Sequence, residues 1–149
     1  MNTEHDELHR PLYVPDLLVN ALNGSPDRPL LLRPDGASIG VHEVRYTSSR
    51  FQQALAALGV GRGTRVGLLS SNLPEVLFTN NAVQLLAAIY VPMHPLGSLA
   101  DHLHVVTDAG VELLVFDPSR YGERAAELAR QVPRLKLVAL GACESAQDL

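Results

Sequence analysis

The 149-residue sequence has one cysteine, no tryptophan and few aromatic residues, which make up 5% of the chain. With Cys143 alone, neither a disulfide nor a cysteine-based zinc site can form within the chain. Cys143 lies in a polar segment of small residues, 141–149, with no adjacent basic residue to activate a thiol. We interpret it as an incidental thiol. Because aromatic residues are scarce, the core must be built from Leu, Val, Ile and Ala.

An excess of basic charge and long hydrophobic runs are also missing. The chain has 12 basic and 16 acidic residues, and Lys136 is its only lysine. The basic residues are scattered, which argues against nucleic acid as the main partner, since phosphate binding needs a concentrated basic patch. No apolar run approaches the roughly 20 residues of a membrane span, and the polar first ten residues do not form a signal sequence. We therefore expect a cytoplasmic protein.

The residues that are present indicate an α/β fold. At 46% hydrophobic and 19% charged residues, the composition is typical of a globular domain. Short apolar runs alternate with amphipathic patterns, which predicts one mostly parallel sheet with helices on both faces. The whole chain, 1–149, is expected to be a single α/β domain. Predicted helices span about 14–22, 40–58, 72–87, 98–109 and 119–131, and predicted strands span about 29–33, 65–70, 89–93, 113–116 and 135–140.

Specific residues mark several helix boundaries. Gly59 is expected to end the helix that precedes it. Asn72 is expected to cap the next helix, with Glu75 at the capping-box position. Ser98 and Asp101 form a second capping-box signature.

The glycine-rich segment 59–63 invites comparison with a dinucleotide-binding loop. Such a loop must follow a strand and open a helix, so that the amides of the helix N-terminus face the phosphate. Here the glycines follow a predicted helix and precede a predicted strand. We interpret the segment as a helix end followed by a turn.

Three histidines lie close together in the sequence, but their spacing does not favour a metal site. His102 and His104 are two residues apart, which places them on different sides of a helix. His102 shares the buried stripe of Leu99 and Val106, so we expect a partly buried or domain-facing side chain. His94 follows a predicted strand, where ligands of parallel sheets bind, but a structural role in its loop is favoured. The role of His94 stays open.

Polar amides interrupt one otherwise apolar helix. Asn80, Asn81 and Gln84 need hydrogen-bond partners if they are buried. They are expected to contact neighbouring elements or another domain, with a substrate contact as the alternative. No Ser/His/Asp or Cys/His set can be assembled from the spacing.

An ordered series of motifs resembles the adenylate-forming superfamily, which comprises acyl-CoA ligases, luciferases and peptide-synthetase adenylation domains. The pattern can be laid without a gap over 58–117, and the resemblance covers about 11–141, leaving 142–149 as a tail. The sequence departs from the family at Gly40, Thr64, Ser71 and Ala87, which leaves the subfamily open. The matching segments are Leu-Gly-Val at 58–60, Gly-Thr-Arg-Val at 63–66, Asn-Leu-Pro-Glu at 72–75, Pro-Met-His-Pro at 92–95, Ser98 with Asp101, and Thr-Asp-Ala-Gly at 107–110.

The resemblance implies an acyl-CoA ligase that activates a carboxylic acid, in the first instance a fatty acid, with Mg-ATP. The acyl-adenylate then passes its acyl group to coenzyme A. The family's phosphate-binding loop, its acidic residues for metal and ribose, and the catalytic lysine of its C-terminal domain have no counterpart here, and Lys136 lies in a strand. We therefore assign no catalytic, cofactor-binding or metal residue to the chain, and predict that the fragment alone is inactive.

Several expectations follow for the complete enzyme. Its cofactors would be ATP, Mg and coenzyme A, and the partner of this fragment would be the missing C-terminal part. Self-association through the exposed face of the subdomain is also expected. The alternatives are a fatty acyl-AMP ligase, a peptide-synthetase adenylation domain or a non-catalytic binding module. The acid, the acceptor and peripheral membrane association stay open.

Overall fold

The computed structural model describes residues 13–24, 28–33, 35–143 and 146–148. The chain divides into two compact units, Met1–Val44 and Arg45–Leu149. Within the described residues, none of the helices is long and apolar enough to cross a bilayer.

Among its described residues, the first unit contains one complete helix, a β-hairpin and the first residues of α3 (Val41–Ala57). Helix α2 (Val14–Leu22) begins after Tyr13 and coincides with the predicted helix. Strands β1 (Pro29–Leu32) and β2 (Ser38–Gly40) pair antiparallel. Apolar side chains on both elements remain exposed: Tyr13, Val14, Leu17, Leu30 and Leu32.

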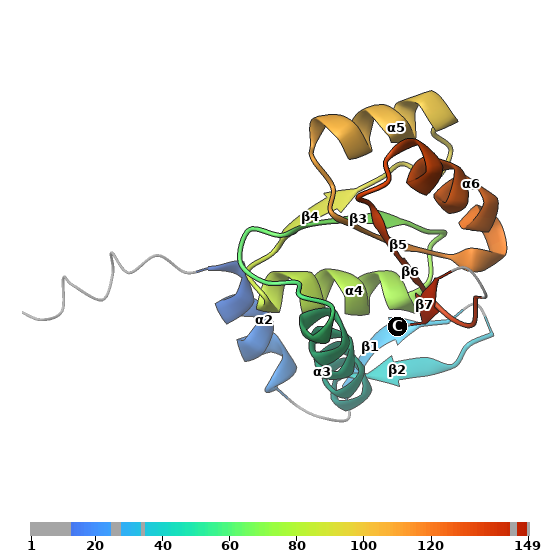
Figure 1. Cartoon of the computed structure of the whole chain (residues 1–149). Coiled ribbons are helices and arrows are strands. Elements are labelled where there is room, and N and C mark those ends of the chain that lie inside the picture. The colour runs from blue at the N-terminus through green and yellow to red at the C-terminus, as the bar shows by residue number, and fades with distance from the viewer. Residues whose placement is uncertain (1–12, 25–27, 34, 144–145, 149) are drawn as a thin grey trace, which may run out of the picture. The chain divides into compact units, whose positions relative to one another are not determined.

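The second unit is built on a five-stranded sheet whose strands all run parallel (Figure 1). Its strands are β3 (Arg65–Leu69), β4 (Ile89–Pro92), β5 (Leu113–Phe116), β6 (Lys136–Ala139) and β7 (Gln147–Asp148), in the spatial order β4-β3-β5-β6-β7. The first four were predicted. The two-residue β7 was not, because its pairing with β6 gives no local sequence signal.

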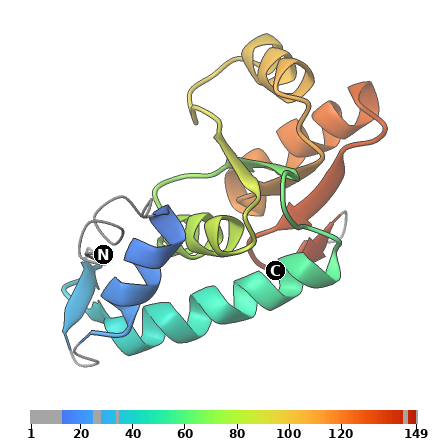
Figure 2. The same ribbon diagram turned by 90° about the vertical axis from the view of Figure 1, so that its left-hand side faces the viewer.

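Helices cover both faces of this sheet, as Figures 1 and 2 show. One face packs against α3 (Val41–Ala57) and α4 (Pro74–Leu85), with Leu55, Ala82 and Val83 in the core. The other packs against α5 (Leu99–Asp108) and α6 (Pro118–Gln131), with Val106, Ala125 and Leu128 in a second core. The fold class, a parallel sheet between helix layers, is therefore confirmed.

Three helices end in the same way. After α3, α4 and α5, the residue with positive φ is Gly59 (88°), Ala87 (53°) and Gly110 (63°). In each case the next amide donates to a carbonyl five residues back, for example Val60 N to Leu55 O at 3.0 Å and Ala88 N to Val83 O at 3.0 Å. This is the Schellman pattern, and it confirms the predicted stops at Gly59 and Gly110.

The predicted cap of α4 at Asn72 is wrong. The N-cap is Leu73, with extended backbone at φ −108° and ψ 154°, and no side chain caps the helix. Pro74 sets this boundary because a proline ring favours an extended preceding residue and needs no hydrogen-bond acceptor at the first helical position. The second predicted capping box is confirmed, since Ser98 Oγ accepts from Asp101 N at 3.1 Å and Asp101 Oδ2 accepts from Ser98 N at 2.9 Å.

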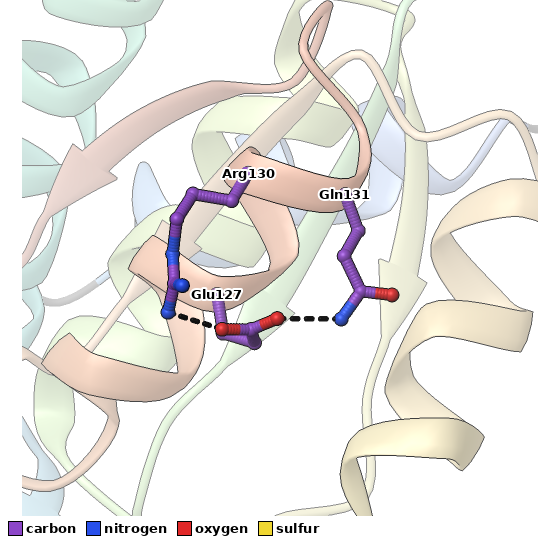
Figure 3. Close-up of polar contacts among 3 residues, drawn as sticks. All are labelled: Glu127, Arg130 and Gln131. Atoms are coloured by element: carbon purple, nitrogen blue, oxygen red, sulfur yellow. Dashed lines mark hydrogen bonds and ion pairs between the residues drawn. The ribbon is translucent and has the colours of Figure 1, made fainter.

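The outer side of α6 carries a small polar cluster (Figure 3). Glu127 pairs with Arg130 and accepts a hydrogen bond from Gln131 Nε2 at 2.6 Å. These contacts lie three and four residues apart on the helix, and Arg130 is 73% exposed. Such exposed pairs add little stability, so we interpret the cluster as a solvated helix face.

Candidate functional site

The carboxyl ends of β3 and β5 lie side by side at a reversal in the strand order. From β3 the chain passes through α4 to β4 on one side, and then through α5 to β5 on the other side of β3. In open parallel sheets, ligands bind outside the carboxyl ends of the strands at such a reversal. The residues that follow β3 and β5, 70–72 and 117–119, therefore form the geometric candidate for a site.

Asp117 is the central side chain at this position. It is only 4% exposed. Its Oδ2 accepts from Ser71 Oγ at 2.5 Å, and its Oδ1 accepts from the Ser119 amide at 3.0 Å and the Ser119 hydroxyl at 2.6 Å. Burial alone would raise the pKa of Asp117, but these hydrogen bonds outweigh it and lower the pKa below its usual value. The carboxylate thus links the two strand ends and caps α6.

The neighbouring Ser70 differs from Ser71. Its Oγ is buried without a hydrogen-bond partner among the described residues. Along β3, Val66 and Leu68 face the α3 and α4 side, while Leu69 faces the other side. The two-residue alternation therefore places Ser70 on the α3 and α4 side, with Val66 and Leu68. Of the two serines, only Ser71 has a hydrogen bond to Asp117.

Loop 93–98 follows β4 at the same edge and is held by side chains from two helices. Tyr121 and Arg124 belong to α6, and His102 belongs to α5. They reach carbonyl oxygens of the loop: His102 Nε2 reaches His94 O at 2.8 Å, Tyr121 Oη reaches Pro95 O at 3.2 Å, and Arg124 Nη1 reaches Gly97 O at 3.0 Å. A Cβ at Gly97 would lie 2.6 Å from His102 Nε2, so the close approach requires glycine.

The three histidines that lie close together in the sequence have different environments in the structure. His102 is 2% exposed, whereas His104 and His94 are exposed. His94 Nδ1 accepts from the Leu96 amide at 3.2 Å, a local contact in line with the favoured structural role in the loop. Among the described residues, no three His, Cys, Asp or Glu side chains gather where they could hold a metal ion.

The glycine-rich segment takes the predicted conformation. Gly59 ends α3, and Gly61 N donates to Thr64 Oγ1 at 3.1 Å in the turn that follows. Gly63, with φ 81°, donates its amide to Ala87 O at 3.0 Å. The segment thus serves as a helix end and a turn before β3.

The polar residues of α4 find partners within the second unit. The buried Asn81 Nδ2 donates to Ser48 Oγ at 3.1 Å, and Gln84 Nε2 donates to Asn80 Oδ1 at 3.0 Å.

Cys143 and Lys136 also have structural contacts. Cys143 is partly buried and packs against the core on the α5 and α6 side. Lys136 Nζ donates to Leu58 O at 3.3 Å, at the C-terminal end of α3, where a cation is favoured. Each of these side chains has an identified structural contact.

A cavity of about 520 Å³ opens at the opposite, amino-terminal edge of the sheet. Leu58, Val60 and Leu113 supply apolar lining, while Arg65, Glu112, Arg134 and Lys136 supply charges. The Arg65 amide donates to Glu112 Oε1 at 3.1 Å. Since the C-terminal ends of α3 and α5 contribute Gly59 and Gly110, partial negative charge also faces this cavity. Cations around it offset that charge.

Sequence reasoning missed the groups that organise the carboxyl edge. Ser71 and Asp117 are 46 residues apart, and Arg124 and Gly97 are 27 apart, so no local pattern connects them. One usable signal was present: Asp117 directly follows an apolar strand and precedes Pro118, which is typical of an N-cap.

Comparison with known proteins decides the family. The family model described as AMP-binding enzyme matches residues 18–148. This chain belongs to the AMP-binding enzyme family. The sequence prediction of an adenylate-forming family is thereby confirmed.

Relatives within the AMP-binding enzymes are similar over most of the chain. It is 41% identical over 132 residues to the medium/long-chain-fatty-acid–CoA ligase FadD8 of Mycobacterium tuberculosis, covering 88% of this chain and 23% of the relative. It is 32% identical over 94 residues to a plipastatin synthase of Bacillus subtilis, covering 63% of this chain and 4% of the relative. The chain thus spans at most about a quarter of these relatives' length.

The fold matches solved structures of the family. A Rhodopseudomonas palustris protein assigned as a long-chain-fatty-acid CoA ligase superposes with a TM-score of 0.82 at 23% identity, covering 95% of this chain and 36% of that structure. This match supports the fold of the AMP-binding enzymes and carries no information on substrate.

Proposed function

We propose that the chain is the N-terminal part of an AMP-forming fatty-acid–CoA ligase. The observation that carries this proposal is the 41% identity to a medium/long-chain-fatty-acid–CoA ligase over 88% of the chain. The complete enzyme would join a carboxylate to AMP, releasing pyrophosphate, and then transfer the acyl group to the thiol of coenzyme A.

The residues that the structure describes do not form a Mg-ATP site. Asp117, the buried carboxylate at the carboxyl edge, has both oxygens engaged by Ser71 and Ser119. No cluster of metal-ligand side chains occurs in the described part of the chain. The segment 59–63 follows a helix, so its amides do not form the phosphate cradle of a helix N-terminus. We therefore assign the chain a scaffolding role and expect nucleotide chemistry to depend on the rest of the enzyme.

The test uses the protein encoded by the complete reading frame. We expect fatty acids of medium or long chain to stimulate ATP–pyrophosphate exchange, and coenzyme A to convert the adenylate to a thioester. Stimulation by amino acids instead, with no fatty-acid response, would contradict the proposal.

The alternative of a peptide-synthetase adenylation domain rests on the 32% identity to plipastatin synthase over 94 residues. A fatty acyl-AMP ligase would also respond to fatty acids. It would accumulate the acyl-adenylate without forming a thioester when coenzyme A is added. Identifying the product as an acyl-adenylate or a thioester therefore distinguishes a fatty acyl-AMP ligase from a fatty-acid–CoA ligase.

A further inference from the structure

The protons on the buried His102 ring are fixed by what its neighbours can do. On one side, Nε2 lies 2.8 Å from the carbonyl oxygen of His94, which can only accept a hydrogen bond. On the other side, Nδ1 lies 2.9 Å from Arg124 Nη1, which can only donate. Both contacts are satisfied together only by a neutral imidazole that carries its proton on Nε2.

A second proton on this ring would break that arrangement. It would reside on Nδ1 and point at the guanidinium of Arg124, so a hydrogen bond would be replaced by contact between two cations. His102 is 2% exposed and lies under Gly97, so water can do little to separate these charges. Arg124 is only half-buried and can move toward solvent, which would also release its bond to Gly97 O.

Other titratable groups surround the ring. Asp101, next to His102 on α5, interacts electrostatically with both His102 and His104, and its carboxylate is held by Ser98. On α6, Tyr121 binds the loop beside Arg124. From the loop, His94 contributes its own ring, whose Nδ1 accepts from the Leu96 amide. A test must therefore separate His102 from His94 in particular.

We infer that His102 and Arg124 form a pH-sensitive clamp that holds loop 93–98 closed while His102 is neutral and releases it when His102 is protonated. The loop carries Leu96, which is 87% exposed, at the carboxyl edge of the sheet, the candidate site for a ligand. Release would change the position of Leu96 and of the His94, Pro95 and Gly97 carbonyls. This inference concerns the 149-residue chain and does not depend on which acid the complete enzyme uses.

The test follows the Gly97 amide, which donates to His94 O at 3.0 Å, by NMR-detected hydrogen exchange on the isotope-labelled chain. Histidines change charge between about pH 8 and pH 5. As pH is lowered through this range, linkage to one proton requires the Gly97 protection factor to fall by up to about tenfold per pH unit. The core amide of Leu114 should keep its protection over the same range. At pH 8 the ring nitrogen spectrum should show the proton on Nε2.

Variants identify the responsible group. His102→Gln can donate to His94 O and accept from Arg124 without titrating, so it should abolish the transition. His94→Asn keeps an acceptor for the Leu96 amide, so the pH-dependent loss of Gly97 protection should persist in this variant. It should also persist in the exposed control His104→Asn. Arg124→Gln removes the opposing charge and can accept a hydrogen bond from a protonated Nδ1, so the loss of Gly97 protection at low pH should weaken or disappear.

Several results would overturn the clamp. These are a proton on Nδ1 at pH 8, protonation of His102 that leaves Gly97 protection unchanged, a full loss of Gly97 protection at low pH in Arg124→Gln, or a transition lost with His94→Asn. If His102→Gln does not fold, the Arg124→Gln and His94→Asn results still decide the question.

Discussion

Asp117 is the residue that ties the carboxyl edge of the sheet together. Its carboxylate accepts three hydrogen bonds, from Ser71 and from two groups of Ser119, and it caps α6. We predict that Asp117→Ala lowers the free energy of unfolding by about 2 kcal/mol, from the lost cap and the partners left unsatisfied. Urea denaturation measures the change. Asp108→Ala, which removes an exposed carboxylate from the unfavourable C-terminal end of α5, should be neutral or slightly stabilising.

Asp117 should also make the free energy of unfolding depend on pH. The folded-state pKa of Asp117 is lowered, so its contribution is fully present above the unfolded value of about 3.9 and is lost as pH falls through the folded pKa. The stability advantage of the wild type over Asp117→Asn should therefore narrow as pH is reduced from 7 to below about 4. Asp101, whose pKa is lowered by its hydrogen bonds with Ser98, is present in both proteins and cancels. A constant difference across this range would contradict the assignment.

At the scale of elements, the helix ends give a paired test. Ala87 adopts φ 53° in the position that Gly59 and Gly110 occupy after the other two helices. A side chain in this left-handed region costs roughly 1 kcal/mol, so Ala87→Gly should stabilise the chain by about that amount.

The opposite substitution, glycine to alanine, should be stabilising at Gly122. This residue lies inside α6, where an added Cβ meets nothing within 4 Å. Gly122→Ala should stabilise by about 0.5–1 kcal/mol, and a loss of stability in either variant, measured by thermal or urea unfolding, would contradict the prediction.

Element boundaries also show what could be predicted from the sequence. Ser98 with Asp101, and the glycines at 59 and 110, act within one helical turn, so their roles were readable from the residues alone. The predicted N-cap at Asn72 was wrong because Pro74, two positions later, constrains Leu73 to an extended conformation and makes Leu73 the N-cap. The His102 clamp and the Ser71–Asp117 contact could not be predicted, because both depend on where the completed sheet places distant segments.

At the scale of the molecule, exposed apolar side chains support the expectation of self-association. Within the first unit, Leu32 is 79% exposed and Tyr13 is 65% exposed. Apolar patches of this kind promote association when nothing covers them. We predict that sedimentation velocity shows concentration-dependent association, weakened by Leu32→Asp and unchanged by Asp35→Asn on the exposed hairpin turn. A monomer at all concentrations would contradict this prediction.

The central proposal is that this chain supplies a scaffold of an AMP-forming ligase, and that nucleotide chemistry depends on residues beyond it. ATP–pyrophosphate exchange measures that chemistry directly, on the folded 149-residue chain and on the protein from the complete reading frame in parallel. With a series of fatty acids, we predict acid-dependent exchange by the complete protein and background exchange by the 149-residue chain. Acid-dependent exchange above background by the 149-residue chain, or its absence from the complete protein, would contradict the claim.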